Sequence, residues 1–227
     1  MQINRLLKAP PQVKAITFDV GGTLIEPWPS LGQIYADVAG RHGYRNLSAE
    51  LLKLKFVAAW RTLKNFNYTR QEWACLVDAT FDGLTHKPPS ETFFPELYDH
   101  FALPDAWRIF PDVVPTLKML SSKGLKLAVI SNWDERLGPL LREFKLDNYF
   151  DPIVISCEIG FCKPSREIFD ATARQIGVSP KEILHVGDNP ANDVDGARAA
   201  GFQARLLLRD SKSLVSEQIA SLAELYS

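Results

Sequence analysis

Mainly apolar runs alternate with stretches of helical spacing along the second half of this chain. Four runs have the length and composition of buried strands, at residues 125–131, 152–156, 182–188 and 204–210. Three of the helical stretches reach a glycine where a helix should end, at Gly124, Gly177 and Gly201. Alternation of this kind predicts a parallel sheet with right-handed crossovers, and a last helix is expected after residue 210.

The first half of the chain follows a different pattern. One apolar run, residues 15–20, predicts a strand, and from about residue 31 to residue 100 the spacing is helical without a strand-like run. Ser48 and Thr69 precede two of the helical stretches as N-caps, and Glu72 adds an acidic third position to the second.

These patterns together predict an α/β chain of two parts. The first strand needs neighbours in order to be buried, so it joins the sheet that the later strands form. A Rossmann-like, doubly wound parallel sheet is expected from residues 1–27 and 104–227, and an all-helical domain of residues 28–103 is inserted into it.

Four short polar segments are candidates for one site, because ligands bind at the carboxyl ends of strands in an open α/β sheet. They are Asp19-Val20-Gly21-Gly22-Thr23, Ser131-Asn132, Lys163-Pro164, and Gly187-Asp188-Asn189 with Asp193. Asp188 and Asp193 lie around a tight turn and suit Mg²⁺, which takes one or two carboxylates together with waters. Each segment alone also fits an ordinary strand end, a helix cap or a solvated lysine, so the prediction rests on their joint occurrence.

The composition limits the classes of partner. The chain has 227 residues, a formal net charge of −1 and a sequence pI of about 6.4. Without a basic excess, neither nucleic acid nor an anionic membrane surface is an expected partner. No apolar stretch approaches the roughly 20 residues of a spanning helix, and the N-terminus lacks the apolar centre of a signal peptide. Three cysteines without metal-ligand spacing fit a reducing compartment, so a cytoplasmic location is expected.

The order of the polar segments resembles the haloacid dehalogenase superfamily, which includes many phosphatases. The matching stretches are residues 15–24, 125–132, 160–169 and 183–201, and the helical insertion lies where the first subfamily carries a helical cap domain. Within the superfamily, SNWDERL, KPSREIF and HVGDNPANDVDGARAAG are similar to the branch called haloacid dehalogenase-like hydrolase domain-containing protein three.

The resemblance implies a role for each polar residue. Asp19 would be a nucleophile that forms an aspartyl-phosphate, and Lys163 would offset the charge where carboxylates meet an anionic substrate. A Mg²⁺ ion would be bound by Asp19, Asp188 and the backbone carbonyl of Gly21, with Asp193 steadying its waters. The phosphoryl oxygens of a small phosphorylated molecule would be held by Thr23, Ser131 and Asn132.

One position departs from the phosphatases of this superfamily. They carry a second Asp two residues after the nucleophile, which protonates the leaving oxygen and later activates water, and this chain has Gly21 there. General acid–base help is worth roughly 10²–10⁴ in rate, so a weak or narrow phosphohydrolase is expected.

Two alternatives stay open, a catalytically silent phosphate-binding or regulatory protein and a different chemistry on the same scaffold, either that of a 2-haloacid dehalogenase or that of a phosphonatase. The dehalogenase would have little use for the pair Asp188 and Asp193. A phosphonatase would tolerate Gly21 but would need a lysine of the cap as a Schiff base, and its candidates are Lys53, Lys55 and Lys64.

The helical insertion is expected to select the substrate, because a bare phosphate site distinguishes little. Four aromatic residues either line the site or form the core of the helix bundle: Trp60, Phe66, Tyr68 and Trp73. Trp28 and Pro29 fall next to the nucleophile, where they are candidates to gate entry. His185 is expected to be a core residue rather than a ligand.

Overall fold

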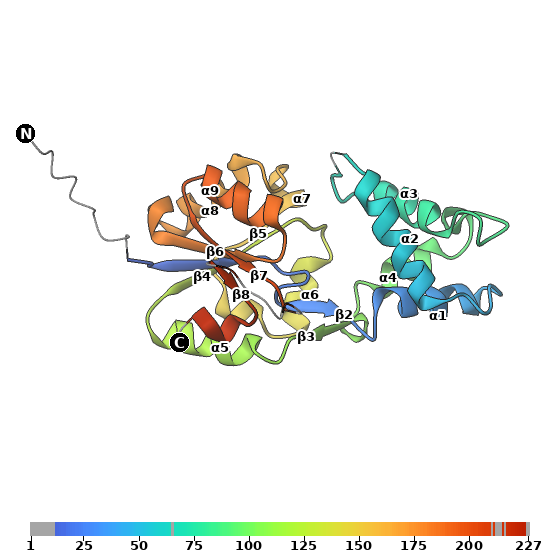
Figure 1. The fold of residues 1–227 in the computed structure, drawn as a ribbon, viewed down its shortest axis with the longest axis horizontal. Coiled ribbons are helices and arrows are strands. Elements are labelled where there is room, and N and C mark those ends of the chain that lie inside the picture. The colour runs from blue at the N-terminus through green and yellow to red at the C-terminus, as the bar shows by residue number, and fades with distance from the viewer. Residues whose placement is uncertain (1–11, 65, 210, 212–214, 216, 226–227) are drawn as a thin grey trace, which may run out of the picture.

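A six-stranded sheet forms the centre of the computed structural model, which describes residues 12–64, 66–209, 211, 215 and 217–225. The strand order is β5–β4–β1–β6–β7–β8, and every described pairing in it is parallel (Figure 1). The strands are β1 (Ala15–Phe18), β4 (Lys126–Ser131), β5 (Ile153–Ile155), β6 (Ile183–Gly187), β7 (Gln203–Leu207) and β8 (Gln218–Ile219). The five strands predicted from apolar runs overlap the first five of these.

Helices cover both faces of the sheet, because successive residues of a buried strand point to opposite faces. The helices that cover the sheet are α5 (Val113–Ser122), α6 (Leu137–Glu143), α7 (Ser156–Ile159), α8 (Arg166–Ile176) and α9 (Gly196–Ala199). Helices α5 and α6 share an apolar cluster with Ile16 and Phe18 on one face, and α8 and α9 share another with Ala15 and Ile130 (Figure 1). The predicted doubly wound α/β fold is therefore confirmed.

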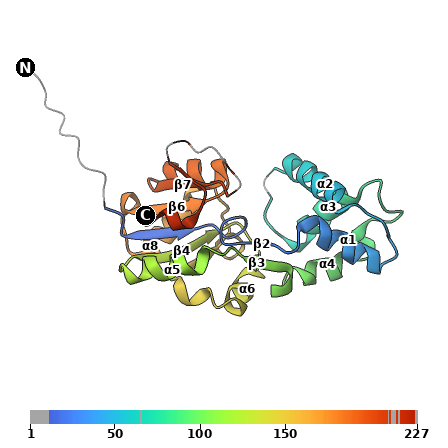
Figure 2. The same cartoon turned by 60° about the horizontal axis from the view of Figure 1, so that its bottom comes forward.

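The four helices between residues 31 and 100 form a separate cluster beside the sheet (Figure 2). They are α1 (Leu31–Arg41), α2 (Ala49–Thr62), α3 (Arg70–Phe81) and α4 (Phe94–His100). Ser48 and Thr69 cap α2 and α3 as predicted, and Glu72 completes a capping box with Thr69. The inner faces of these helices bury apolar residues around Tyr35 and Phe81, whose rings stack with centroids 5.8 Å apart.

A short antiparallel ribbon carries the chain between the sheet and this helical cluster. It pairs β2 (Ile25–Pro27) with β3 (Trp107–Ile109), so that Pro27 lies opposite Trp107. Strands of three residues are too short to show a period, which is why the sequence pattern did not predict them. The chain therefore enters the helical cluster through β2 and leaves it through β3, at adjacent points (Figure 1).

Two predicted helices near the C-terminus differ in the structure. The segment 192–201 begins as a π-helical turn, Pro190–Asp195, and becomes α-helical only in α9. The prediction of a last helix is wrong for the described residues, because β8 pairs with β7 there and Leu222 is buried in a 3₁₀ turn. The open edge of β7 offers unpaired backbone groups that a following strand can satisfy. The remaining residues of that prediction lie outside the described residues: 210, 212–214, 216, 226 and 227.

The other helical turns are short. The 3₁₀ turns are Pro89–Glu91, Pro104–Ala106, Asp147–Tyr149, Pro180–Glu182 and Leu222–Leu225. Of the helices that the structure describes, none has both the length and the apolar character needed to cross a bilayer.

Candidate active site

Strands β4, β1 and β6 are neighbours, and their carboxyl ends carry three of the four predicted polar segments. Asp19 follows β1, Ser131 ends β4, and Asp188 follows β6. The chain returns from β5 to β6 on the other side of β1, and such a switch point is where an open parallel sheet forms a crevice. The fourth segment joins them, because the loop after α7 brings Lys163 to the same edge.

The carboxylate of Asp19 is buried and held by donors from three segments. Oδ1 accepts hydrogen bonds from Lys163 Nζ at 2.7 Å and Ser131 Oγ at 3.3 Å, and Oδ2 accepts one from Thr23 Oγ1 at 3.5 Å. Burial raises the pKa of Asp19 above its ordinary value, although the charge of Lys163 lowers it. The carboxylate is thus poorly solvated and fixed in one orientation, as a nucleophile in an enzyme site needs to be.

Lys163 is the buried cation of the site, with only 4% of its surface exposed. Its Nζ donates to Asp19 Oδ1 at 2.7 Å and to Asp193 Oδ1 at 2.6 Å. Burial lowers the pKa of Lys163, but the charges of the two carboxylates outweigh burial and hold it above its ordinary value. An ammonium group has three N–H donors, so one remains for a ligand.

Asp193 ties this ion pair to the turn after β6. Its Oδ1 also accepts from His185 Nε2 at 3.2 Å, and its Oδ2 accepts from the backbone N–H of Asn189 at 2.9 Å. Burial raises the pKa of Asp193, but the charge of Lys163 and the hydrogen bond from His185 hold it below its ordinary value. Burial lowers the pKa of His185, whose Nδ1 accepts from Thr17 Oγ1 at 2.8 Å. His185 is a core residue, as predicted, and supports Asp193.

The amide of Asn132 binds the backbone of Lys163 on both sides. Its Nδ2 donates to the Lys163 carbonyl at 2.9 Å, and its Oδ1 accepts from the Lys163 N–H at 2.7 Å. Asn132 therefore fixes the loop that carries the cation. Its expected contact with a phosphoryl oxygen stays a prediction, to be made by the second N–H of the amide.

Asp188 completes a cluster of carboxylates at this edge. One oxygen each of Asp19, Asp188 and Asp193 lies within 4.8 Å of the others. Asp188 keeps an exposed surface, but its partial removal from water and the charges of the other two carboxylates raise its pKa to about 7, and Lys163 offsets them only in part. Hard oxygen ligands with excess negative charge are what a divalent cation such as Mg²⁺ prefers, so this donor set fits that ion.

Two glycines of the motifs make room for these carboxylates. A Cβ on Gly22 would collide with Asp188 Oδ2, and the φ of 76° at Gly22 also disfavours any other residue. A Cβ on Gly187 would collide with the carboxyl group of Asp193. The spacing of glycine and aspartate in both motifs therefore has a steric reason.

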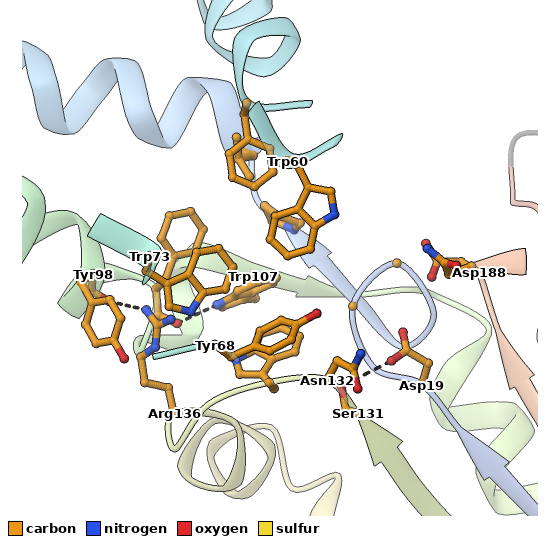
Figure 3. Close-up of a pocket in the computed structure, with 18 of the residues that line it drawn as sticks. Asp19, Trp60, Tyr68, Trp73, Tyr98, Trp107, Ser131, Asn132, Arg136 and Asp188 are labelled. Atoms are coloured by element: carbon orange, nitrogen blue, oxygen red, sulfur yellow. Dashed lines mark hydrogen bonds between the residues drawn. The ribbon is translucent and has the colours of Figure 1, made fainter. Parts of the chain in front are cut away.

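A cavity of about 420 Å³ extends from the carboxylates toward the helical cluster (Figure 3). Trp60, Tyr68 and Trp73 line it, as one of the two sequence interpretations had it. Phe66 is not among the lining residues; its ring packs against those three with centroids 5.2, 4.9 and 5.0 Å away. Three of the four aromatic residues therefore line the cavity, and Phe66 supports them from behind.

Trp28 lies outside the lining of this cavity. Its side chain is 45% exposed, and the guanidinium of Arg108 lies over its ring at 3.8 Å. The residue of this segment that lines the cavity is Pro27, at the end of β2. A gating role of Trp28 and Pro29 stays a prediction.

Tyr68 reaches from the helical cluster toward the carboxylates. Its hydroxyl points to the end of the cavity that holds Asn132 and Asp19 (Figure 3). Burial raises the pKa of Tyr68, so the phenol is neutral at ordinary pH. Its backbone has φ of 62°, an unusual conformation for a residue other than glycine and one that is common at functional sites.

A buried ion pair that the sequence reasoning missed joins the sheet to the helical cluster. Asp134 is fully buried, pairs with Arg136 at 2.6 Å and accepts a hydrogen bond from Trp73 Nε1 at 2.8 Å. Arg136 Nη1 donates to the Tyr98 carbonyl at 2.8 Å, and its guanidinium lies over the Tyr98 ring (Figure 3). The sequence feature that could have indicated this ion pair is an acidic and a basic residue two positions apart, shortly after the predicted strand of residues 125–131.

Gly21 lies against the indole ring of Trp133. A Cβ added to Gly21 would stand 3.2 Å from Trp133 Cζ3, closer than ordinary van der Waals contact. The glycines with positive φ include Gly22 but not Gly21, so the backbone at position 21 accepts other residues. Trp133 in turn packs on Trp107 of β3, with ring centroids 5.1 Å apart.

The four motifs and strands β1, β4, β5 and β6 of the sheet lie within one matched region. A family model described as haloacid dehalogenase-like hydrolase matches residues 13–201. The chain belongs to the haloacid dehalogenase-like hydrolase family. Among curated members, haloacid dehalogenase-like hydrolase domain-containing protein 3 of Homo sapiens is 32% identical over 208 residues, 87% of this chain and 82% of that protein. The resemblance inferred from the motifs is confirmed.

Solved structures of the haloacid dehalogenase-like family share the fold. A HAD phosphatase from Thermococcus onnurineus matches with a TM-score of 0.68 and 25% identity, over 94% of this chain and 96% of that chain. A HAD hydrolase from Bacillus subtilis, bound to magnesium, matches with a TM-score of 0.75 and 21% identity, over 95% and 97% of the chains. At this identity the second match shows the fold alone.

Proposed function

We propose that the protein is a Mg²⁺-dependent phosphohydrolase that acts on a small phosphorylated molecule through an aspartyl-phosphate on Asp19. The observation that carries the proposal is the carboxylate cluster, in which Lys163 Nζ lies 2.7 Å from Asp19 and the three carboxylates lie within 4.8 Å. A phosphate dianion that approaches these groups needs more positive charge than one lysine supplies. A divalent cation supplies the rest.

Four residues would hold the ion at this site. Asp19, Asp188 and the backbone carbonyl of Gly21 would bind it, and Asp193 would orient its waters. When bound, Mg²⁺ polarises the phosphoryl group and offsets the negative charge that gathers around it.

The side chains of the protein carry the remaining chemistry. Asp19 attacks phosphorus, the bond from phosphorus to the leaving oxygen breaks, and water later cleaves the aspartyl-phosphate to phosphate and free Asp19. Lys163 holds Asp19 in place and offers its third N–H to a phosphoryl oxygen. The hydroxyls of Thr23 and Ser131 stand beside the same carboxylate, where they can donate to the phosphoryl group.

Gly21 makes this activity weak or narrow, because no carboxylic acid stands at the position that protonates the leaving group and activates water. The same residue favours the second candidate, a phosphate-binding or regulatory protein without turnover. A 2-haloacid dehalogenase is less favoured, because that reaction displaces halide without a metal and has no need of a third carboxylate at Asp188.

The helical insertion supplies the second part of the proposed enzyme. We assign residues 28–103 as a cap domain over a core of residues 1–27 and 104–227. Support comes from the separate apolar cluster of its helices and from the cavity, which residues of both parts line. Cys75, Cys157 and Cys162 are all free thiols, which supports a reducing compartment and the proposed cytoplasmic location.

Removing Asp188 tests the metal site directly. In Asp188→Ala the affinity for Mg²⁺, measured by titration calorimetry, should fall by more than the roughly 10–100-fold typical of losing an outer-shell partner. Asp195→Ala is the matched control, because Asp195 is exposed on the same turn and lies outside the carboxylate cluster. An unchanged affinity in Asp188→Ala would count against the site as drawn.

Mg²⁺ binding should weaken as the pH falls through about 7. The raised pKa of Asp188 means that its carboxyl is protonated below about pH 7, and a bound proton must leave before the metal enters. The apparent affinity should therefore drop about tenfold per unit below that pH and level off above it. Calorimetry at several pH values measures the slope, which should be shallower in Asp188→Ala. A wild-type affinity that rises on acidification would contradict the prediction.

A further inference from the structure

The part of the cavity beyond the carboxylates is walled by aromatic rings. We call it the aromatic chamber, and its lining includes Tyr35, Trp60, Tyr68, Trp73, Trp107 and Trp133. Trp60 and Trp73 stack with centroids 5.8 Å apart and planes at 28°, which leaves flat apolar faces along one wall. Another aromatic ring packs on such faces better than an aliphatic group of equal area.

The described residues offer the aromatic chamber no unpaired positive charge for an ionic ligand. Among the described residues that line the cavity, the cations are Lys163 and Arg136. Lys163 is held at the carboxylates, and Arg136 donates from Nε and Nη2 to Asp134 and from Nη1 to the Tyr98 carbonyl. A carboxylate or second phosphate in the chamber would have to share Arg136 with Asp134, and a buried anion without a cation of its own is costly. The group that fits the chamber is therefore uncharged.

Position 21, on the wall of the chamber next to the nucleophile, carries no acid. Gly21 lines the cavity, and Trp133 stands 3.2 Å from the point where a Cβ of residue 21 would be. Among the described residues, the carboxyl groups that line the cavity are Asp19, Asp188 and Asp193, which all belong to the carboxylate cluster, so a leaving oxygen finds no further acid there. An alkoxide is then a poor leaving group, whereas a phenolate, whose conjugate acid has a pKa of about 10, departs as a stable anion.

We propose that the substrate is an aryl phosphate, the phosphate monoester of an uncharged aromatic hydroxyl whose ring lies in the aromatic chamber. This inference rests on the proposed function. Asp19 attacks phosphorus, and the bond from phosphorus to the aryl oxygen breaks with its electron pair on that oxygen, which takes a proton from water. Water then attacks phosphorus of the aspartyl-phosphate, and phosphate, a proton and free Asp19 result.

Four phosphate compounds distinguish the proposed hydrolysis itself from the effects of the leaving group and of the size of the ring. Acetyl phosphate carries a good leaving group and no ring, so its Mg²⁺-dependent hydrolysis reports the proposed function alone. Phenyl and benzyl phosphate carry the same ring but leave as a phenol and an alcohol, and phenyl phosphate should have a kcat/KM about 10²-fold higher. 2-Naphthyl phosphate adds a second ring and should exceed phenyl phosphate by about tenfold through the extra buried area.

Variants of α2 test the aromatic chamber. In Trp60→Ala the preference for 2-naphthyl over acetyl phosphate should fall about tenfold, and Trp60→Phe should recover most of it. Leu54→Ala is the matched control, because Leu54 lies on the same helix with 58% exposure and does not line the cavity. Its preference should equal that of the wild type. Circular dichroism melts confirm that each variant is folded.

Binding of inert analogues keeps the two proposals apart. Phenylphosphonate should bind the Mg²⁺-loaded protein about tenfold more tightly than methylphosphonate. Hydrolysis of acetyl phosphate with equal rates for phenyl and benzyl phosphate would overturn the aryl phosphate while the proposed function stands. Absence of all hydrolysis would overturn the proposed function, and tighter phenylphosphonate binding would then still support the aromatic ligand. Equal binding of the two phosphonates would overturn the inference in either case.

Discussion

Replacing Asp19 by Asn should lower Mg²⁺-dependent hydrolysis of acetyl phosphate by about 10³-fold or more, to the rate of the uncatalysed reaction. The amide has the same shape but cannot attack phosphorus, so no aspartyl-phosphate forms. Lys163 keeps its contact with Asp193 at 2.6 Å, so the loop that carries the cation should stay in place. Phosphate release measures the loss of turnover, and trapping of the phosphorylated protein measures the loss of the aspartyl-phosphate.

Asp195→Asn makes the same chemical change at an exposed position on the turn after β6 and should hydrolyse acetyl phosphate at the wild-type rate. A thermal melt of Asp19→Asn separates loss of chemistry from loss of fold. Turnover that persists in a folded Asp19→Asn protein would remove Asp19 from the mechanism and with it the proposed function.

Restoring an acid at position 21 should raise the hydrolysis of benzyl phosphate by about 10²–10⁴-fold, provided that Trp133 is made smaller at the same time. The backbone at Gly21 accepts Asp, but its Cβ would meet the outer ring of Trp133 at 3.2 Å. Phe lacks that outer ring and can still pack on Trp107. The double variant Gly21→Asp with Trp133→Phe should therefore gain more than Gly21→Asp alone, and Trp133→Phe alone should not gain.

The gain should depend on the leaving group. Acetyl phosphate needs no protonation to leave, so any increase there reports activation of water in the second step rather than protonation in the first. Steady-state and burst kinetics on both substrates distinguish these steps. A folded double variant that binds Mg²⁺ and hydrolyses neither substrate would favour the phosphate-binding protein without turnover.

The convergence of Asp19 and Asp188 was predictable because each follows an apolar run that had to be a buried strand. In a parallel sheet the carboxyl ends of neighbouring strands share one edge, so topology alone brought the two segments together. The capping of α2 and α3 was predictable for a similar reason, since Ser48 and Thr69 act on backbone groups a few residues away.

The burial of Lys163 could not be read from the chain, because it arises from two carboxylates on other elements. Nothing local to Lys163 distinguishes it from a solvated loop lysine. The contact between Gly21 and Trp133 is of the same kind, since the two residues belong to loops after different strands. The β2–β3 ribbon was missed because three residues cannot show a period, and β8 because its pairing depends on the open edge of β7.

The β2–β3 ribbon has a consequence for how this fold can diversify. Because Pro27 and Trp107 face each other, the chain leaves the core and returns to it at adjacent points. A different helical block can be grafted between these points without displacing the strands that carry Asp19 and Asp188. The main requirement at the junction is a pair of new partners for Asp134 and Arg136, which now bind Trp73 Nε1 and the Tyr98 carbonyl. The proposed phosphoryl chemistry thus belongs to the core, whereas the helical block contributes an exchangeable part of the cavity wall.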